Sequence, residues 1–175
     1  SGCLHCIACC YSLGWLSFLA VVFFNFREFD LDVVVFDYPC DTSIKYIKRL
    51  IGLPGDEISY KNKQIKINGD LLANKFQYVY KNTKQYGAHV YEESIGKNTH
   101  LALLTPSRRG KEGVFEVPEG HYFFMGDNRD NSKDGRYDCP GYVPRNHIVG
   151  KATTIWFNWD FSSLPEWNRI GKSID

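Results

Sequence analysis

A polar block close to the C-terminal end holds the side chains best suited to chemistry. Residues 126–136 contain three aspartates, two asparagines and two arginines. Only Met125 separates this block from the apolar residues 122–124. Gly126, Asp127 and Asn128 favour a turn, because these residue types tolerate unusual backbone angles and bond their own backbone. A network of charged side chains costs more free energy to bury than a simple turn requires, because every polar group in it needs a partner. Two interpretations stay open: a solvated charged loop, which composition alone favours, or part of a functional site.

Lys48 is the second candidate for chemistry. It stands beside Arg49 in a β-like run with Ile47 and Leu50 as apolar neighbours. Side chains alternate between the faces of a strand, so Lys48 and Arg49 are expected to point in opposite directions. A lysine packed against apolar groups loses hydration and its pKa falls, which makes its neutral amine a competent general base. The alternative is a strand lysine whose amine reaches water.

Together these segments resemble the type I signal peptidases, membrane-bound serine proteases that use a Ser/Lys dyad. The resemblance covers about residues 32–80 and 115–160 and keeps the order of the family's motifs. The matching pieces are residues 32–36, Lys48-Arg49 followed by Gly52-Leu53-Pro54-Gly55-Asp56, residues 126–136, residues 141–144 and residues 148–152.

The resemblance implies a role for each matching residue. Lys48 would be the general base, which takes the proton of a serine hydroxyl and later passes it to the leaving amine. Ser132 would bond this lysine and orient it. Two ion pairs would support the site, Arg49 with Asp127 and Asp134 with Arg136. Tyr46 and Ile47 would line a pocket for small substrate side chains, and their strand would form hydrogen bonds with the extended substrate backbone.

The nucleophile remains unknown. The family carries it ahead of the lysine in a motif of the type Ser-x-Ser-Met-x-Pro-Thr, whereas the single methionine of this chain is Met125. None of the serines ahead of Lys48 precedes a methionine or lies near a Pro-Thr pair; they are Ser1, Ser12, Ser17 and Ser43. We therefore expect that the chain as written does not cleave, since loss of the nucleophile removes the covalent route.

Residues 1–30 form an apolar N-terminal segment. Residues 6–24 carry no charge, and a stretch of this length can span a membrane as a helix. Only residues 25–31 separate it from the strand expected at Asp32, a gap in which the family fits its nucleophile-bearing segment. Three explanations are open: a fragment or frame-shifted reading, which we favour, a natural deletion that leaves a pseudoenzyme, or an artificial replacement of the front.

Length and pattern predict a mainly β fold. The 175 residues allow one domain over residues 31–175, with a variable insertion or second small sheet around 81–113 to which we assign no chemistry. Short strand-like runs lie between Gly, Pro and Asn turns, and Asn68-Gly69 is a strong hairpin signal. We expect an antiparallel β-sheet sandwich or partly open barrel of the signal peptidase type. The net charge of +1 offers no argument for a nucleic-acid partner.

The cysteines and histidines do not predict a metal site or a cofactor. Cys3, Cys6, Cys9 and Cys10 have spacing that zinc would accept, but no downstream pair completes the set, so membrane-segment cysteines or out-of-frame sequence are the favoured interpretations. Cys40 and Cys139 each lie close in sequence to one of the matching motifs, so a disulfide between them is possible, although nothing else in the sequence supports it. The five histidines show no ligand spacing; they are His5, His89, His100, His121 and His147.

The resemblance implies a membrane-bound endopeptidase that removes signal peptides from exported preproteins. Its catalytic domain would lie on the outer, periplasmic side of the bacterial cytoplasmic membrane, and its oligomeric state is not predicted. Two other functions remain: a non-catalytic β domain that binds extended peptides, which the missing serine favours, and a Ser/Lys self-cleaving regulator, against which the block at residues 126–136 argues.

Overall fold

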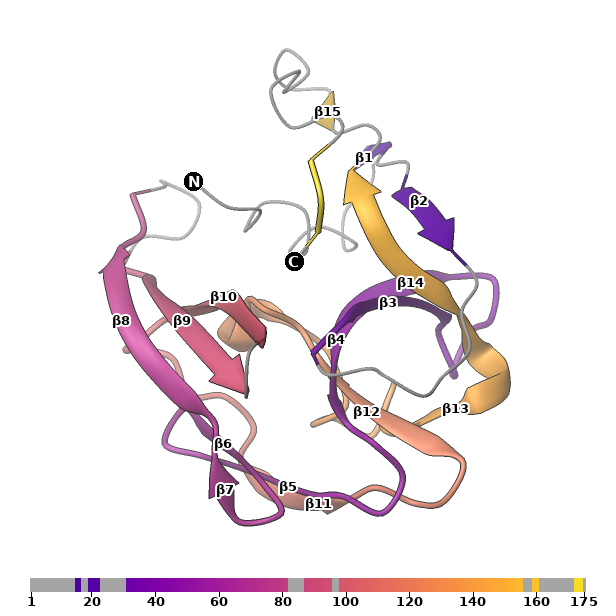
Figure 1. Cartoon of the computed structure of the whole chain (residues 1–175), viewed down its shortest axis with the longest axis horizontal. Coiled ribbons are helices and arrows are strands. Elements are labelled where there is room, and N and C mark those ends of the chain that lie inside the picture. The colour runs from indigo at the N-terminus through magenta and orange to yellow at the C-terminus, as the bar shows by residue number, and fades with distance from the viewer. Residues whose placement is uncertain are drawn as a thin grey trace.

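The computed structural model describes residues 31–81, 87–95, 98–155 and 172–174, with strand residues 15–16, 19–22 and 159–160 (Figure 1). Strands dominate these residues, and the helices among them are two short 3₁₀ turns, η2 (Arg129–Asn131) and η3 (Arg145–His147). Every pairing between the described strands is antiparallel. The mainly β, antiparallel fold that the sequence predicts is confirmed.

The largest sheet has six strands in the order β13-β12-β4-β3-β14-β2. Its central strand β3 is buried from Val33 to Phe36, with Val34 and Phe36 in one apolar cluster and Val33 and Val35 in another. Both faces of β3 are therefore covered, which explains its unbroken apolar sequence. The strands are β2 (Leu19–Val22), β3 (Val33–Asp37), β4 (Lys45–Gly52), β12 (His121–Met125), β13 (Val143–Pro144) and β14 (Ile148–Ile155).

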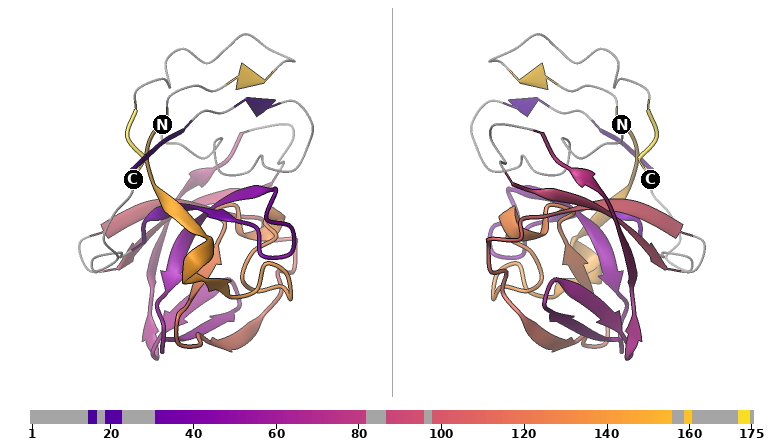
Figure 2. Two further views of the ribbon diagram at one scale, coloured as in Figure 1. Left: turned by 90° about the vertical axis from the view of Figure 1, so that its right-hand side faces the viewer. Right: turned by 90° about the vertical axis from the view of Figure 1, so that its left-hand side faces the viewer.

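A four-stranded sheet in the order β11-β5-β6-β7 packs against the largest sheet. One cluster joins Ile51 and Phe123 of the large sheet to Ile58, Tyr60 and Ile65 of the smaller one. Side views place this sheet at the opposite end of the molecule from the short β1–β15 pair (Figure 2). The strands are β1 (Trp15–Leu16), β15 (Trp159–Asp160), β5 (Glu57–Lys61), β6 (Gln64–Ile67), β7 (Asp70–Leu71) and β11 (Gly113–Glu116).

Part of the segment around residues 81–113 lies in a small three-stranded sheet. Strands β9 (His89–Ile95) and β10 (Asn98–Leu104) pair with each other, and β8 (Ala73–Val79) completes the sheet. The pairing of Leu103 with Asn128 connects this sheet to the polar block, so the small sheet reaches the predicted site.

Cys40 and Cys139 form a disulfide with a Cα–Cα distance of 6.4 Å. It ties the turn between β3 and β4 to the segment that follows the polar block. The four N-terminal cysteines lie outside the described residues. Of the apolar residues 6–24, the structure describes only β1 and β2. Among the described residues, the structure has no helix with the length and apolar character needed to cross a membrane.

Candidate active site

Lys48 lies in the interior on β4, with 6% of its surface exposed. It pairs across the sheet with Val34 of β3, and its Nζ lies 5.4 Å from the centre of the Tyr46 ring. Tyr46 itself is buried and stacks on Tyr38 at 4.4 Å between ring centres. The lysine is thus held in an apolar and aromatic environment rather than on a solvated face.

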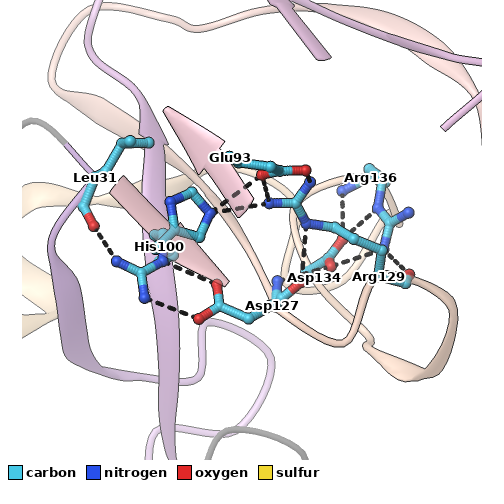
Figure 3. A network of polar contacts seen from close by, with 9 residues as sticks. Leu31, Glu93, His100, Asp127, Arg129, Asp134 and Arg136 are labelled. Atoms are coloured by element: carbon cyan, nitrogen blue, oxygen red, sulfur yellow. Dashed lines mark hydrogen bonds and ion pairs between the residues drawn. The ribbon is translucent and has the colours of Figure 1, made fainter. Parts of the chain in front are cut away.

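Arg49 is held by the first aspartate of the polar block. Its Nε and Nη2 donate to the two carboxylate oxygens of Asp127 at 2.9 and 2.8 Å, and its Nη1 donates to the carbonyl of Leu31 (Figure 3). Burial would raise the pKa of the Asp127 carboxyl, but the charge and hydrogen bonds of Arg49 hold that pKa below its usual value. The cation beside Lys48 is therefore neutralised locally by a buried, bidentate partner.

Gly126 marks the point where Lys48 and Ser132 approach each other. A Cβ atom on this glycine would collide with the Ser132 side chain and would lie 3.5 Å from Lys48 Nζ. Among the described residues Ser132 Oγ has no hydrogen-bond partner, so the expected bond between Ser132 and Lys48 is absent from the structure. The two groups converge on Gly126 from separate segments, and the orienting role of Ser132 stays a prediction.

Asp134 and Arg136 form a buried ion pair around the same glycine. Arg136 donates from Nε and Nη2 to the two oxygens of Asp134, each at 2.8 Å. Asp134 Oδ2 also accepts the backbone N–H of Gly126 at 3.0 Å. The pair expected from the resemblance is present, and it fixes the backbone beneath Ser132.

Arg129, which the sequence reasoning left without a role, holds the other side of Gly126. Its Nε donates to the Gly126 carbonyl at 3.2 Å, and its Nη1 and Nη2 donate to the two oxygens of Glu93. His100 Nε2 lies 3.1 Å from Glu93 (Figure 3). Burial opposes ionisation of Glu93, but Arg129 and His100 lower its pKa to about 2. Glu93 and His100 lie opposite each other in the hairpin of β9 and β10, a pairing that the sequence analysis did not predict.

Asp130 is a second residue of the block that the sequence reasoning did not assign. Its carboxylate accepts from Lys63 Nζ at 2.7 and 2.8 Å and from the backbone N–H of Thr105 at 2.6 Å. It therefore joins the turn between β5 and β6 to the segment after β10. This contact explains why the block needs a third aspartate.

Ile47 occupies a different position from Tyr46. It is half-buried and packs against Val33, Val35 and Ala152 on the other face of β4. Tyr46 and Ile47 thus lie on opposite faces of one strand, and their expected role in a substrate pocket remains a prediction. Chemically, the site offers a buried amine, a nearby hydroxyl and rigid ionic supports, the components of a base held ready for a nucleophile.

Residues 17–159 match the family model described as "Signal peptidase, peptidase S26". A signal peptidase I from Pseudomonas fluorescens is 43% identical over 154 residues, which cover 80% of this chain and 54% of that protein. A signal peptidase I from Rickettsia typhi is 37% identical over 175 residues, which cover 86% of this chain and 63% of that protein. The chain spans about half the length of the first of these relatives.

A signal peptidase I from Enterococcus faecalis is similar in its crystal structure. The match covers 75% of this chain and 100% of that chain, with 28% identity and a TM-score of 0.46.

Proposed function

Because this chain belongs to the signal peptidase family, peptidase S26, we propose that it provides the general base of a membrane-bound serine endopeptidase that removes signal peptides from exported preproteins. The observation that supports this most directly is the position of Lys48, buried beside Gly126 and Ser132 while its neighbour Arg49 is paired with Asp127. An amine withdrawn from water, next to a cation neutralised by another group, suits proton transfer near neutral pH.

In this proposal the neutral Lys48 amine takes the proton of a serine hydroxyl as that oxygen attacks the scissile carbonyl. The ammonium then gives the proton to the leaving amine, which leaves the serine as an acyl ester. The same lysine next takes a proton from a water molecule whose oxygen attacks the ester carbonyl, and it returns that proton to the serine oxygen as the acyl group departs as a carboxylic acid. Ser132 would orient the amine, and Tyr46 and Ile47 would contact small substrate side chains. The nucleophile is not assigned to any residue of this chain.

The location proposed for the domain is the outer side of the bacterial cytoplasmic membrane. The Cys40–Cys139 disulfide supports it, because such bonds persist in oxidising compartments such as the periplasm. The relatives described above come from bacteria, which agrees with a bacterial membrane as the proposed location.

The test is cleavage by residues 32–175 joined to a signal peptidase N-terminal segment that carries the Ser-Met motif. Lys48→Ala should reduce cleavage of a preprotein by about 1,000-fold or more, the upper range for a general base. Lys45→Ala is the matched control: it lies on the same strand but is exposed and paired with Asp37, so cleavage should be unchanged. A Lys48→Ala protein that still cuts at the normal rate would falsify the base assignment.

A non-catalytic domain that binds extended peptides is the second candidate. It is favoured by one observation, the lack of a serine followed by methionine ahead of Lys48. We expect the chain as written to show no turnover of a preprotein. Turnover that persists through purification, and is lost in none of the site variants, would show that another residue acts as nucleophile and base.

A further inference from the structure

Gly126 is gripped at both of its backbone polar groups by buried charged side chains. Its N–H donates to Asp134, which Arg136 holds in turn, and its carbonyl accepts from Arg129 Nε (Figure 3). A Cβ atom on this residue would collide with Ser132 and would lie 3.5 Å from Lys48 Nζ, so both side chains lie close to Gly126. A small displacement of the Gly126 backbone would therefore change the space that these two groups share.

The two grips differ in where they are anchored. Asp134 and Arg136 belong to the same short block as Gly126. Arg129 is anchored from outside the block, by a bidentate ion pair with Glu93, 36 residues away on β9. Glu93 is 1% exposed and Arg129 is equally buried, so neither charge can be compensated by water.

Glu93 has charged or polar partners both inside and outside its own sheet. Across the hairpin, His100 Nε2 lies within hydrogen-bonding distance of its carboxylate, and from the polar block Arg129 donates to the same carboxylate. The neighbouring Glu92 is half-buried and its side chain points to the opposite face of β9. Arg129, the partner of Glu93, also donates to the Gly126 carbonyl. The ion pair therefore holds the backbone of the candidate site as well as joining β9 to the polar block.

We propose that Glu93 is a positioning residue for the candidate site: through Arg129 it sets the position of the Gly126 backbone, and thereby how Ser132 and Lys48 lie around that glycine. The inference deepens the proposed function and rests on it, since it takes Lys48 to be the base. It assigns a role in the site to the small sheet β8–β9–β10, from which no chemistry was expected.

The test measures the state of Lys48 directly and needs no nucleophile. The full chain, labelled with ¹³C at the lysine ε carbons and held in detergent micelles, is titrated by NMR, and the Lys48 signal is assigned by its loss in Lys48→Arg. Glu93→Gln removes the charge with little change of shape. Glu92→Gln is the matched control on the same strand, and Glu93→Asp is the conservative variant that keeps the charge.

We expect Glu93→Gln to move the titration midpoint of Lys48 toward that of the exposed lysines by about half a pKa unit or more. Glu92→Gln should leave it unchanged, and Glu93→Asp should restore it at least partly. A direct effect of charge has the opposite sign, because removing a nearby anion favours the neutral amine. A midpoint that moves away from the exposed lysines would therefore overturn the inference.

Urea unfolding of the same variants separates positioning from mere anchoring. If Glu93→Gln lowers stability while Lys48 of the folded protein titrates as in the wild type, Glu93 is only an anchor and the inference is overturned. If Glu93→Gln does not fold, Arg129→Lys replaces it, since it keeps the charge opposite Glu93 but loses the rigid fork that reaches Gly126. An unchanged Lys48 midpoint in that variant overturns the inference as well.

Failure of the proposed function has a different signature. If the proposed function is wrong, Lys48 of the wild-type chain titrates together with the exposed lysines and Lys48→Ala leaves cleavage intact. That result would reject both the base role of Lys48 and the positioning role of Glu93. A distinctive Lys48 in the wild type that is unmoved by Glu93→Gln removes only the positioning role.

Discussion

At the scale of single residues, the polar block works through paired charges around one glycine. Arg49 with Asp127, Arg136 with Asp134, and Arg129 with Glu93 are each buried and bidentate. Each cation is neutralised by its own carboxylate, so the block can be buried without a large net charge near Lys48. Asp134 and Arg129 bond the backbone of Gly126, and Ser132 and Lys48 lie beside the same residue.

The first prediction concerns Gly126→Ala. The added methyl group collides with Ser132, and overpacking of this kind costs about 1–3 kcal/mol of stability. Adding Ser132→Gly to the same protein should recover most of this loss, because the colliding side chain is gone, while cleavage by the joined protein should stay low. Urea unfolding of both single variants and the double variant measures the coupling. Additive effects would show that the two residues do not touch.

At the scale of elements, local patterns account well for the strands. The turn between β6 and β7 has positive φ angles at both Asn68 and Gly69, 52° and 88°, which is the backbone that an Asn-Gly hairpin requires. Asn68 also accepts the N–H of Glu57 through its side-chain oxygen, which secures the hairpin to β5. Both the turn type and the strand before it depend on adjacent residues, and the sequence predicts them for that reason.

The second prediction follows from this turn. Gly69→Ala has open space for its methyl group, but a residue with a Cβ in this left-handed backbone costs about 1–2 kcal/mol. Chemical unfolding should show that loss without a change of the transition slope, and cleavage by the joined protein should be unaffected. Lys66→Ala, exposed on the adjacent strand, is the control and should leave stability almost unchanged. Equal stability of Gly69→Ala and wild type would contradict the hairpin geometry.

At the scale of the whole molecule, buried carboxylates join parts that are distant in sequence. Glu93 attaches the three-stranded sheet to the block, and Asp130 attaches the turn between β5 and β6 and the segment after β10. Ionised carboxylates that are paired in the folded protein make its stability depend on pH. For Glu93 the folded pKa is about 2, below the ordinary value of 4.5.

The third prediction is a loss of stability in acid. A depressed folded pKa contributes stability that is complete above the unfolded pKa and is lost as the pH falls through the folded pKa. The free energy of unfolding should therefore decrease between about pH 4.5 and pH 2, with Asp127 contributing in the same direction. Urea titrations at several pH values measure the slope. Glu93→Gln should flatten it relative to Glu92→Gln, and equal slopes in these two variants would refute the assignment.

The sequence by itself determined the β class and the Asn68-Gly69 hairpin, and it singled out the polar block at residues 126–136. Each of these follows from residue periodicity or from a short motif. Only the tertiary structure decided that Glu93 holds Arg129, that Asp130 receives Lys63 and Thr105, and that Cys40 meets Cys139, 99 residues away. The tertiary structure also shows no hydrogen bond between Ser132 Oγ and Lys48. The physical reason is that local patterns state which side chains will be buried or charged, whereas the partner of a buried charge depends on which sheets pack together, and that is set by the whole chain.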